Sequence, residues 1–166
     1  MTKARAAGQR PQTNNVFVKQ HCCGRSCVFT THQLKAVLDA ANKLSQFGGT
    51  LLSTLALSGV RITEIVTVRW RNVRADELVL EPPLCPEKPA RRVACPKLMD
   101  LLREWREAQS RERPVNLEDF VFRGRKHETH ISRQTVDLVL RQLFEKLKIQ
   151  GAPTHSFRFH LAQKPA

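Results

Sequence analysis

The stretch that decides the fold reads Ala56-Leu57-Ser58-Gly59-Val60-Arg61-Ile62-Thr63-Glu64-Ile65. An apolar helix is predicted over residues 50–57, and the Ser58-Gly59 pair ends it. The next helix is predicted to begin near Arg61 or Ile62, because apolar side chains then recur at helical spacing. The sequence therefore places an arginine at the opening of a helix, directly after a glycine break.

On the C-terminal side of this stretch, the spacing of apolar residues changes from helical to strand-like and then back to helical. Strands are predicted at 77–81 and 91–95, and the prolines between them (Pro82, Pro83, Pro86 and Pro89) indicate a hairpin with a long, stiff connection. Helices are predicted from Thr30 or Thr31 to the Gly48-Gly49 pair, over residues 98–108, from the cap at Ser132 to Gly151, and within 154–163. The predicted fold class is α+β, mainly α-helical with a small antiparallel β-hairpin.

The first 29 residues differ from the rest of the chain. They carry no acidic residue, and their basic residues are Lys3, Arg5, Arg10, Lys19 and Arg25. This segment is rich in glycine, proline, glutamine and asparagine and shows no regular spacing of apolar residues. We interpret residues 1–29 as a flexible basic arm and residues 30–166 as the folded domain.

Composition and charge limit the function classes. Hydrophobic residues make up 41% of the chain, which is enough for a core, and the net charge of +13 favours nucleic acid as the partner. No apolar run reaches the roughly 18 residues of a membrane helix, and no signal peptide is visible. We therefore expect a cytoplasmic, nucleic-acid-binding protein with no membrane contact.

A cluster near the N-terminus contains the residue types that bind zinc: His21, Cys22, Cys23, Cys27 and His32. A structural zinc site usually has two ligand pairs of the form Cys-x₂₋₄-Cys, and the spacing of these cysteines does not provide two such pairs. We interpret the cysteines as reduced thiols and predict neither a metal nor a small-molecule cofactor.

Four features together resemble the tyrosine recombinase, or phage integrase, family over about residues 30–160. The stretch 56–65 looks like the first signature, and Thr154-His155-Ser156-Phe157-Arg158 looks like the second, the His-x-x-Arg box. A β-hairpin lies between the two signatures, as in the family. Ile131-Ser132-Arg133-Gln134-Thr135, followed by an apolar helix, is similar to the segment that precedes the box.

The resemblance implies a phosphate-binding site. Attack on a phosphodiester builds negative charge on its oxygens, which two guanidiniums can bind, and Arg61 and Arg158 are the candidates. His155 would bond to the same phosphate or move a proton. A hairpin lysine would protonate the leaving oxygen; Lys88 is the first choice and Lys97 the second. We expect Glu64 to be a structural partner of Arg61.

The chain also departs from the family. The family's nucleophile is a tyrosine near the C-terminus, and this sequence contains no tyrosine. Eight residues follow Arg158, and the second histidine or tryptophan of the family is missing. The resemblance thus implies a truncated catalytic domain that binds DNA but does not cleave it. The alternatives are a non-catalytic DNA-binding or regulatory module, and an unrelated basic fold.

Two further expectations concern surfaces. The basic residues Arg123, Arg125, Lys126 and Arg133 are predicted to contact DNA phosphates. Helices built on Leu51, Leu55, Val139 and Leu143 are expected to leave apolar surface open. Self-association or pairing with an intact recombinase would cover such a surface.

Overall fold

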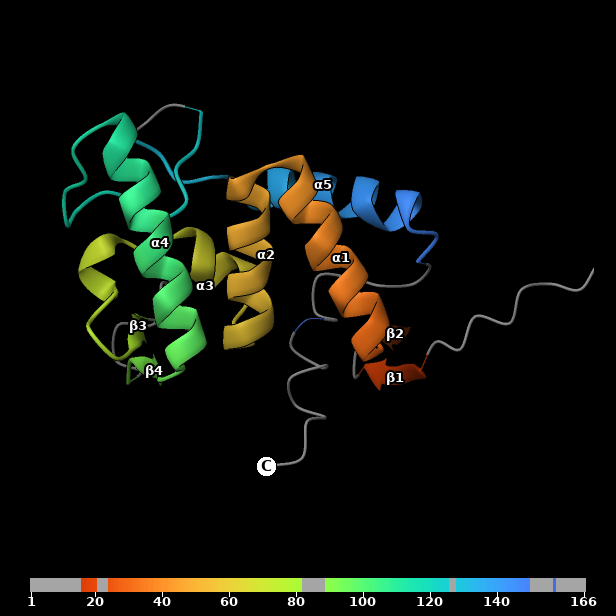
Figure 1. Cartoon of the computed structure of the whole chain (residues 1–166). Coiled ribbons are helices and arrows are strands. Elements are labelled where there is room, and N and C mark those ends of the chain that lie inside the picture. Colours follow the sequence, from red (N-terminus) through yellow and green to blue (C-terminus); the bar gives the residue numbers. More distant parts are fainter. Residues whose placement is uncertain (1–15, 21–23, 82–88, 126–127, 150–156, 158–166) are drawn as a thin grey trace, which may run out of the picture.

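A computed structural model of the chain describes residues 16–20, 24–81, 89–125, 128–149 and 157 (Figure 1). The element order is β1 (Val16–Gln20), β2 (Gly24–Val28), α1 (Thr31–Leu44), α2 (Gln46–Ser58), α3 (Ile62–Val66), the 3₁₀ helix η1 (Trp70–Asn72), β3 (Leu78–Leu80), β4 (Arg91–Val93), α4 (Pro96–Glu112) and α5 (Arg133–Lys146). The predicted class, mainly helical with a small antiparallel sheet, is confirmed. Within the described ranges, no helix is long and apolar enough to cross a membrane.

Helices α1 and α2 form an antiparallel pair that turns at Ser45. Thr30 caps α1, since its hydroxyl accepts a hydrogen bond from the backbone N–H of Gln33 at 3.1 Å. The prediction that Gly48 and Gly49 stop this helix was wrong, because both lie inside α2. A Cβ atom at position 49 would meet the Asn42 side chain at 1.7 Å, so glycine there permits α2 to approach α1 closely.

The break between α2 and α3 lies where the sequence predicted it. Gly59 follows α2 with φ of 60° and ψ of 22°, the left-handed conformation that favours glycine. Its backbone N–H donates to the carbonyl of Leu55 at 3.0 Å. The chain then turns, and Arg61 is the N-cap of α3.

Strands β3 and β4 form the predicted hairpin, in which Leu78 pairs with Val93 and Leu80 with Arg91. Both strands are shorter than predicted. The proline-containing connection at 82–88 lies outside the described residues.

Two short strands lie within residues 1–29, the segment interpreted from the sequence as a flexible basic arm. Strands β1 and β2 pair antiparallel, with Val16 opposite Val28 and Val18 opposite Ser26. Valine at three of the ten strand positions favours an extended backbone. The sequence did not predict these strands because they are short and lie within a polar segment.

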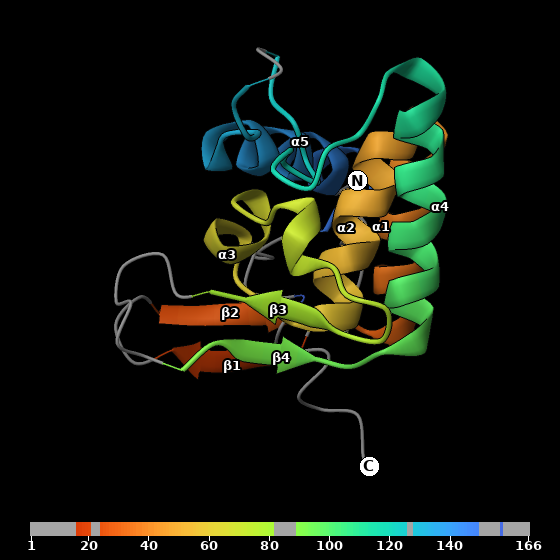
Figure 2. The ribbon, with the colours of Figure 1, turned by 90° about the vertical axis from the view of Figure 1, so that its left-hand side faces the viewer.

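The core is built around α2, which packs against α1 on one side and α4 on the other, while α3 and α5 pack against each other (Figures 1 and 2). The expectation of open apolar surface was wrong for Leu51, Leu55 and Leu143, which are at most 3% exposed. Neighbouring helices cover these side chains. In the part of the chain that the structure describes, the large apolar residues that face solvent are Leu44, Leu117 and Leu138.

One part of the core is polar and fully paired. The Trp70 indole donates to the Gln109 side-chain oxygen at 3.2 Å, and the Gln109 amide donates to the Val121 carbonyl at 3.0 Å. The Trp105 indole donates to the same carbonyl at 2.9 Å. These bonds fix η1, α4 and the 120s segment relative to one another.

Candidate nucleic-acid interface

Arg61 lies where a phosphate could reach it. Its side chain is 56% exposed, and its guanidinium lies 3.4 Å from the Glu64 carboxylate. Glu64, whose side chain is 17% exposed, also accepts a hydrogen bond from the Arg61 backbone N–H at 2.7 Å. Glu64 thus orients the start of α3 and leaves more than half of the Arg61 side chain open to solvent, where an anion could bind.

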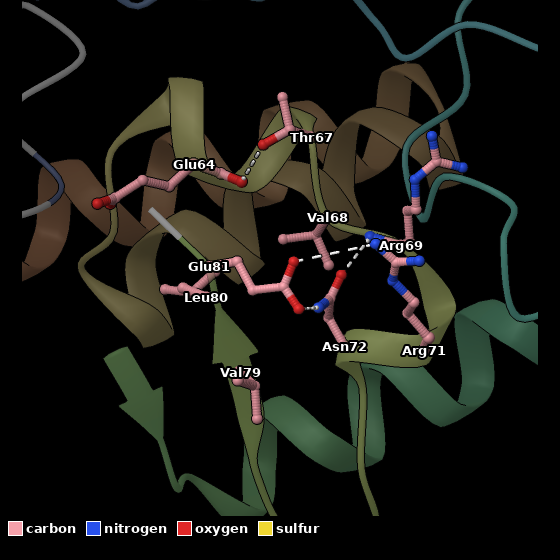
Figure 3. A pocket seen from close by; sticks show the side chains of 9 residues that line it. All are labelled: Glu64, Thr67, Val68, Arg69, Arg71, Asn72, Val79, Leu80 and Glu81. Carbon is pink, nitrogen blue, oxygen red and sulfur yellow. Dashed lines mark hydrogen bonds and ion pairs between the residues drawn. The ribbon is translucent and has the colours of Figure 1, made fainter. Parts of the chain in front are cut away.

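A pocket of about 180 Å³ adjoins Glu64 between α3, η1 and β3 (Figure 3). Arg69, Arg71 and Glu81 line it, and Figure 3 shows Glu81 and Asn72 pointing toward each other across it. The Asn72 amide donates to Glu81 at 3.3 Å. Glu81 is the last described residue before the hairpin connection, so the pocket lies between α3, which Arg61 opens, and the β3–β4 hairpin.

The two lysine candidates differ in what the structure shows of them. Lys88, the first choice, lies outside the described residues. Lys97, the second choice, is exposed in the first turn of α4 and not in the hairpin. On β4, Arg91 donates to the Ser58 carbonyl at 3.4 Å, which fixes the hairpin to the end of α2 just before Arg61. The sequence analysis missed this contact.

Of the second signature, the structure describes Phe157, and both His155 and Arg158 lie outside the described residues. Phe157 is 1% exposed. Its ring centroid lies 5.1 Å from that of Phe29, whose ring in turn packs 5.7 Å from Phe144 of α5. The middle of the His-x-x-Arg box is therefore anchored in the core between the start of α1 and the end of α5.

Arg123, one of the predicted DNA contacts, has its side chain turned into the protein. The side chain is 10% exposed, and its guanidinium lies 2.8 Å from the Asp119 carboxylate. Burial lowers the pKa of Arg123 below its ordinary value, while the negative charge of Asp119 opposes that shift. This placement favours a structural role.

The other predicted DNA contacts lie on the surface where the structure describes them. Arg125 is exposed, and Lys126 beside it lies outside the described residues. Arg133 opens α5 and is 58% exposed, with Asp137 at 3.4 Å one turn later. The exposed face of α5 continues with Gln134 and Arg141, which lie two turns apart on the same side of the helix.

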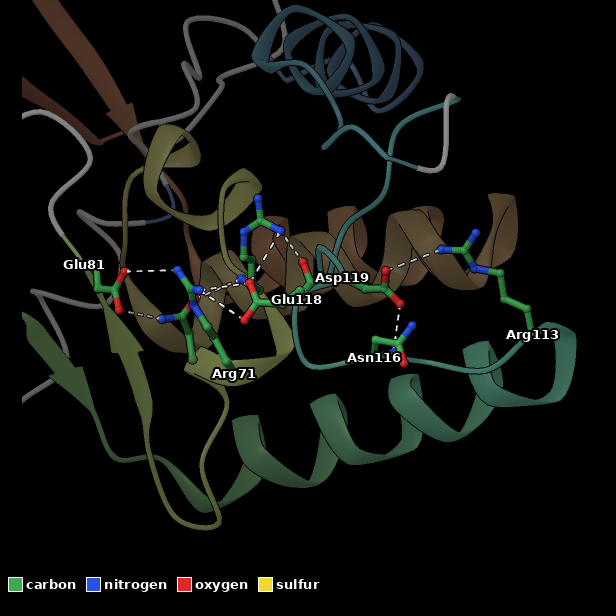
Figure 4. A network of polar contacts seen from close by, with 8 residues as sticks. Arg71, Glu81, Arg113, Asn116, Glu118 and Asp119 are labelled. Atoms are coloured by element: carbon green, nitrogen blue, oxygen red, sulfur yellow. Dashed lines mark hydrogen bonds and ion pairs between the residues drawn. The ribbon is translucent and has the colours of Figure 1, made fainter.

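An ion-pair network joins η1 to the 110s loop (Figure 4). Arg71 lies 2.9 Å from Glu118 and 3.9 Å from Glu81. Arg69 packs its guanidinium 4.2 Å above the Phe120 ring and donates to the Glu118 carbonyl. The sequence analysis missed these arginines, although they flank the buried Trp70 and so had to face outward.

No metal site is present among the described residues, since no three histidine, cysteine or acidic side chains group closely enough there to hold an ion. Cys22 and Cys23 lie outside the described residues. The hypothesis of a zinc site at the N-terminal cluster is therefore left untested.

Comparison with known proteins agrees with this geometry. The profile of the phage integrase family matches residues 28–164. No curated protein is similar enough to this sequence to count as a match. Because the family profile covers most of the sequence, the chain belongs to the phage integrase family, and the predicted resemblance to tyrosine recombinases is confirmed.

Solved structures show the same fold. The crystal structure of XerA recombinase matches with a TM-score of 0.66 and 18% identity, over 81% of this chain and 48% of that one. XerH site-specific recombinase bound to difH substrate matches with a TM-score of 0.63, 12% identity and coverages of 84% and 43%. A lambda integrase dimer bound to a COC′ core site matches with a TM-score of 0.63 and 13% identity, over 82% of this chain and 39% of that one. The chain thus spans about half or less of these proteins' length.

Proposed function

We propose that this chain is a DNA-binding part of a tyrosine recombinase, a protein of site-specific DNA integration or recombination. The observation that carries the proposal is the placement of Arg61, which opens α3 with its side chain more than half exposed and its backbone N–H bonded to Glu64. Arg158 and His155 would bind the same phosphate, and Lys88 would approach from the hairpin. The DNA complexes of XerH and lambda integrase support a DNA partner.

The proposed interface combines Arg61 with the start of α5. Arg125 and Arg133 would neutralise backbone phosphates, and Gln134 and Arg141 lie along the same exposed side of α5. A positively charged guanidinium bonded to a phosphate releases a counterion from the DNA, so affinity should fall with salt. Arg123 is left out of this interface because it is paired inside the protein.

The experiment is a salt titration of binding to a labelled 30-base-pair duplex, followed by fluorescence polarisation. Arg125→Ala and Arg133→Ala should each weaken binding and reduce the slope of log affinity against log salt by about one. Arg111→Ala is the matched control, since Arg111 is an exposed arginine on α4. Equal effects of all three variants, or binding that is insensitive to salt, would remove the support for this interface.

The chain as it stands would bind DNA without cutting it, because its 166 residues include no tyrosine. Self-association, or pairing with an intact recombinase, belongs to the same proposal. Lambda integrase is described as a dimer on its core site. Exposed Leu44, Leu117 and Leu138 would be available for such contacts.

A further inference from the structure

The outer face of α4 carries a set of arginines that the proposed DNA interface does not use. In Figure 2, α4 forms one edge of the molecule, and α3 with the start of α5 lies toward the other edge. Met99, Arg103, Arg106 and Ser110 recur at three- and four-residue spacing and therefore share one side of the helix.

Two adjoining hollows follow this side of α4. The first has a volume of about 190 Å³, and Trp70, Val73 and Met99 are among its apolar lining residues. The second has a volume of about 510 Å³ and lies further along the helix, toward Arg111. Arg103 and Arg106 line both hollows, so the two form one continuous surface, which we call the α4 groove.

The charge of the α4 groove is strongly one-sided. Four arginines line it (Arg74, Arg103, Arg106 and Arg111), against the single carboxylate of Glu107. Arg106 lies 5.5 Å from the Trp70 ring, and among the described residues no carboxylate lies within 4 Å of its guanidinium. Arg74 pairs with the half-buried Glu77, and Arg103 pairs with the exposed Asp100. A solvent-exposed pair such as Arg103–Asp100 exchanges readily for an incoming carboxylate.

The groove also has a size and a polarity along its length. From Met99 to Arg111 the helix rises about 18 Å, which matches about five residues of extended chain. The end beside Trp70 and Val73 is apolar, and the end beside Ser110 and Arg111 is polar. A duplex backbone offers phosphates but no aliphatic group for the apolar end, whereas a peptide offers both.

We propose that the α4 groove binds a short acidic segment of a partner protein, in which one aliphatic side chain occupies the hollow beside Trp70 and carboxylates meet Arg103, Arg106 and Arg111. The arginines would give the segment its charge preference, and the apolar hollow would fix its position. This site is separate from the proposed DNA interface and does not depend on it.

The test uses the full chain and fluorescein-labelled peptides at physiological salt, with polarisation as the readout. The probe is Asp-Glu-Leu-Asp-Glu; the matched peptides are Asn-Gln-Leu-Asn-Gln, which lacks charge, and Asp-Glu-Ala-Asp-Glu, which lacks the anchor. We expect the probe to bind more tightly than both. The double variant Arg103→Glu, Arg106→Glu should weaken probe binding about tenfold, while the charge-matched double variant Lys35→Glu, Lys43→Glu on the exposed side of α1 should leave it within about twofold.

Three outcomes would overturn the proposal: no binding of the probe below 1 mM, equal weakening by the Lys35→Glu, Lys43→Glu variant, or displacement of the probe by a stoichiometric amount of unlabelled duplex. The last outcome would assign the groove to DNA. If loss of the Arg106 contact with Trp70 unfolds the double variant in a circular dichroism melt, Arg103→Glu with Arg111→Glu replaces it, because both side chains are exposed.

Discussion

Glu64 contacts Arg61 in two ways, through the backbone N–H at 2.7 Å and through the guanidinium at 3.4 Å. The first contact satisfies a donor at the opening of α3, and the second holds the side chain without covering it. Sequence spacing alone predicted the pairing, because residues three apart at a helix start lie close together. It could not predict that the arginine stays exposed, which depends on the helices packed around it.

Replacing Glu64 should separate these two roles. Glu64→Ala removes the acceptor of the Arg61 N–H and should lower the free energy of unfolding by about 1 kcal/mol, whereas Glu64→Gln keeps an acceptor and should cost less than half as much. Urea unfolding followed by circular dichroism measures both. An equal loss in the two variants would show that charge, and not capping, is what Glu64 contributes.

Arg123 and Arg125 look alike in the sequence, and both were predicted to bind DNA. Asp119 and the surrounding core separate them, since one guanidinium is enclosed and the other faces solvent. Asp119 lies only four residues before Arg123, but this spacing does not show that the core encloses the Arg123 side chain, because that burial depends on how the chain packs around it.

The two arginines should therefore respond oppositely to alanine. Arg123→Ala leaves the Asp119 carboxylate with a lost partner and should lower the free energy of unfolding by about 2 kcal/mol. Arg125→Ala should change stability by less than about 0.5 kcal/mol and act on DNA affinity instead. Thermal melts measure the stability of both variants, and duplex titrations measure their DNA affinity; each variant should lose only one of the two. A destabilised Arg125→Ala with normal DNA binding would contradict it.

At the scale of elements, apolar periodicity predicted α1, α2, α4, α5 and the β3–β4 hairpin. It failed where two elements meet. The Gly48-Gly49 pair has the composition of a helix end, but a close approach of α2 to Asn42 requires the second glycine. The β1–β2 pair was missed because its strands are short and lie within a polar, basic segment.

The two neighbouring glycines offer a matched pair of substitutions. Gly49→Ala places a Cβ atom 1.7 Å from the Asn42 side-chain oxygen and 3.0 Å from the Asn42 Cα, so the Asn42 side chain must turn away and the two helices must separate slightly. We expect this substitution to lower the free energy of unfolding by about 1–3 kcal/mol. At position 48, among the described side chains, the new Cβ atom of Gly48→Ala would meet only the Ser45 hydroxyl, at 3.1 Å. Because alanine also has a higher helix propensity than glycine, Gly48→Ala should change the free energy of unfolding by less than about 1 kcal/mol. Differential scanning calorimetry of the two variants decides between these expectations; a larger loss in Gly48→Ala would refute this account of the interface.

At the scale of the whole molecule, a fold shared with recombinases is combined with a sequence that contains no tyrosine. Incubation of the chain with a nicked suicide duplex should leave no SDS-resistant protein–DNA adduct, because no tyrosine is present to form the phosphotyrosyl bond. An intact, active recombinase on its own suicide substrate is the positive control. A single adduct mapped by mass spectrometry to any residue of this chain would overturn the expectation.

The central claim is that Arg61 and Arg158, ninety-seven positions apart in the sequence, bind one phosphate. A double-mutant cycle on duplex affinity tests it directly, with Arg61→Ala, Arg158→Ala and the double variant, and with Arg61→Ala plus Arg111→Ala as the control cycle. Guanidiniums on the same phosphate should couple by about 1 kcal/mol, and the control pair should be additive within about 0.5 kcal/mol. Additive losses for Arg61 and Arg158, equal to those of the control pair, would mean that the two residues serve separate sites, and the shared phosphate-binding site would be ruled out.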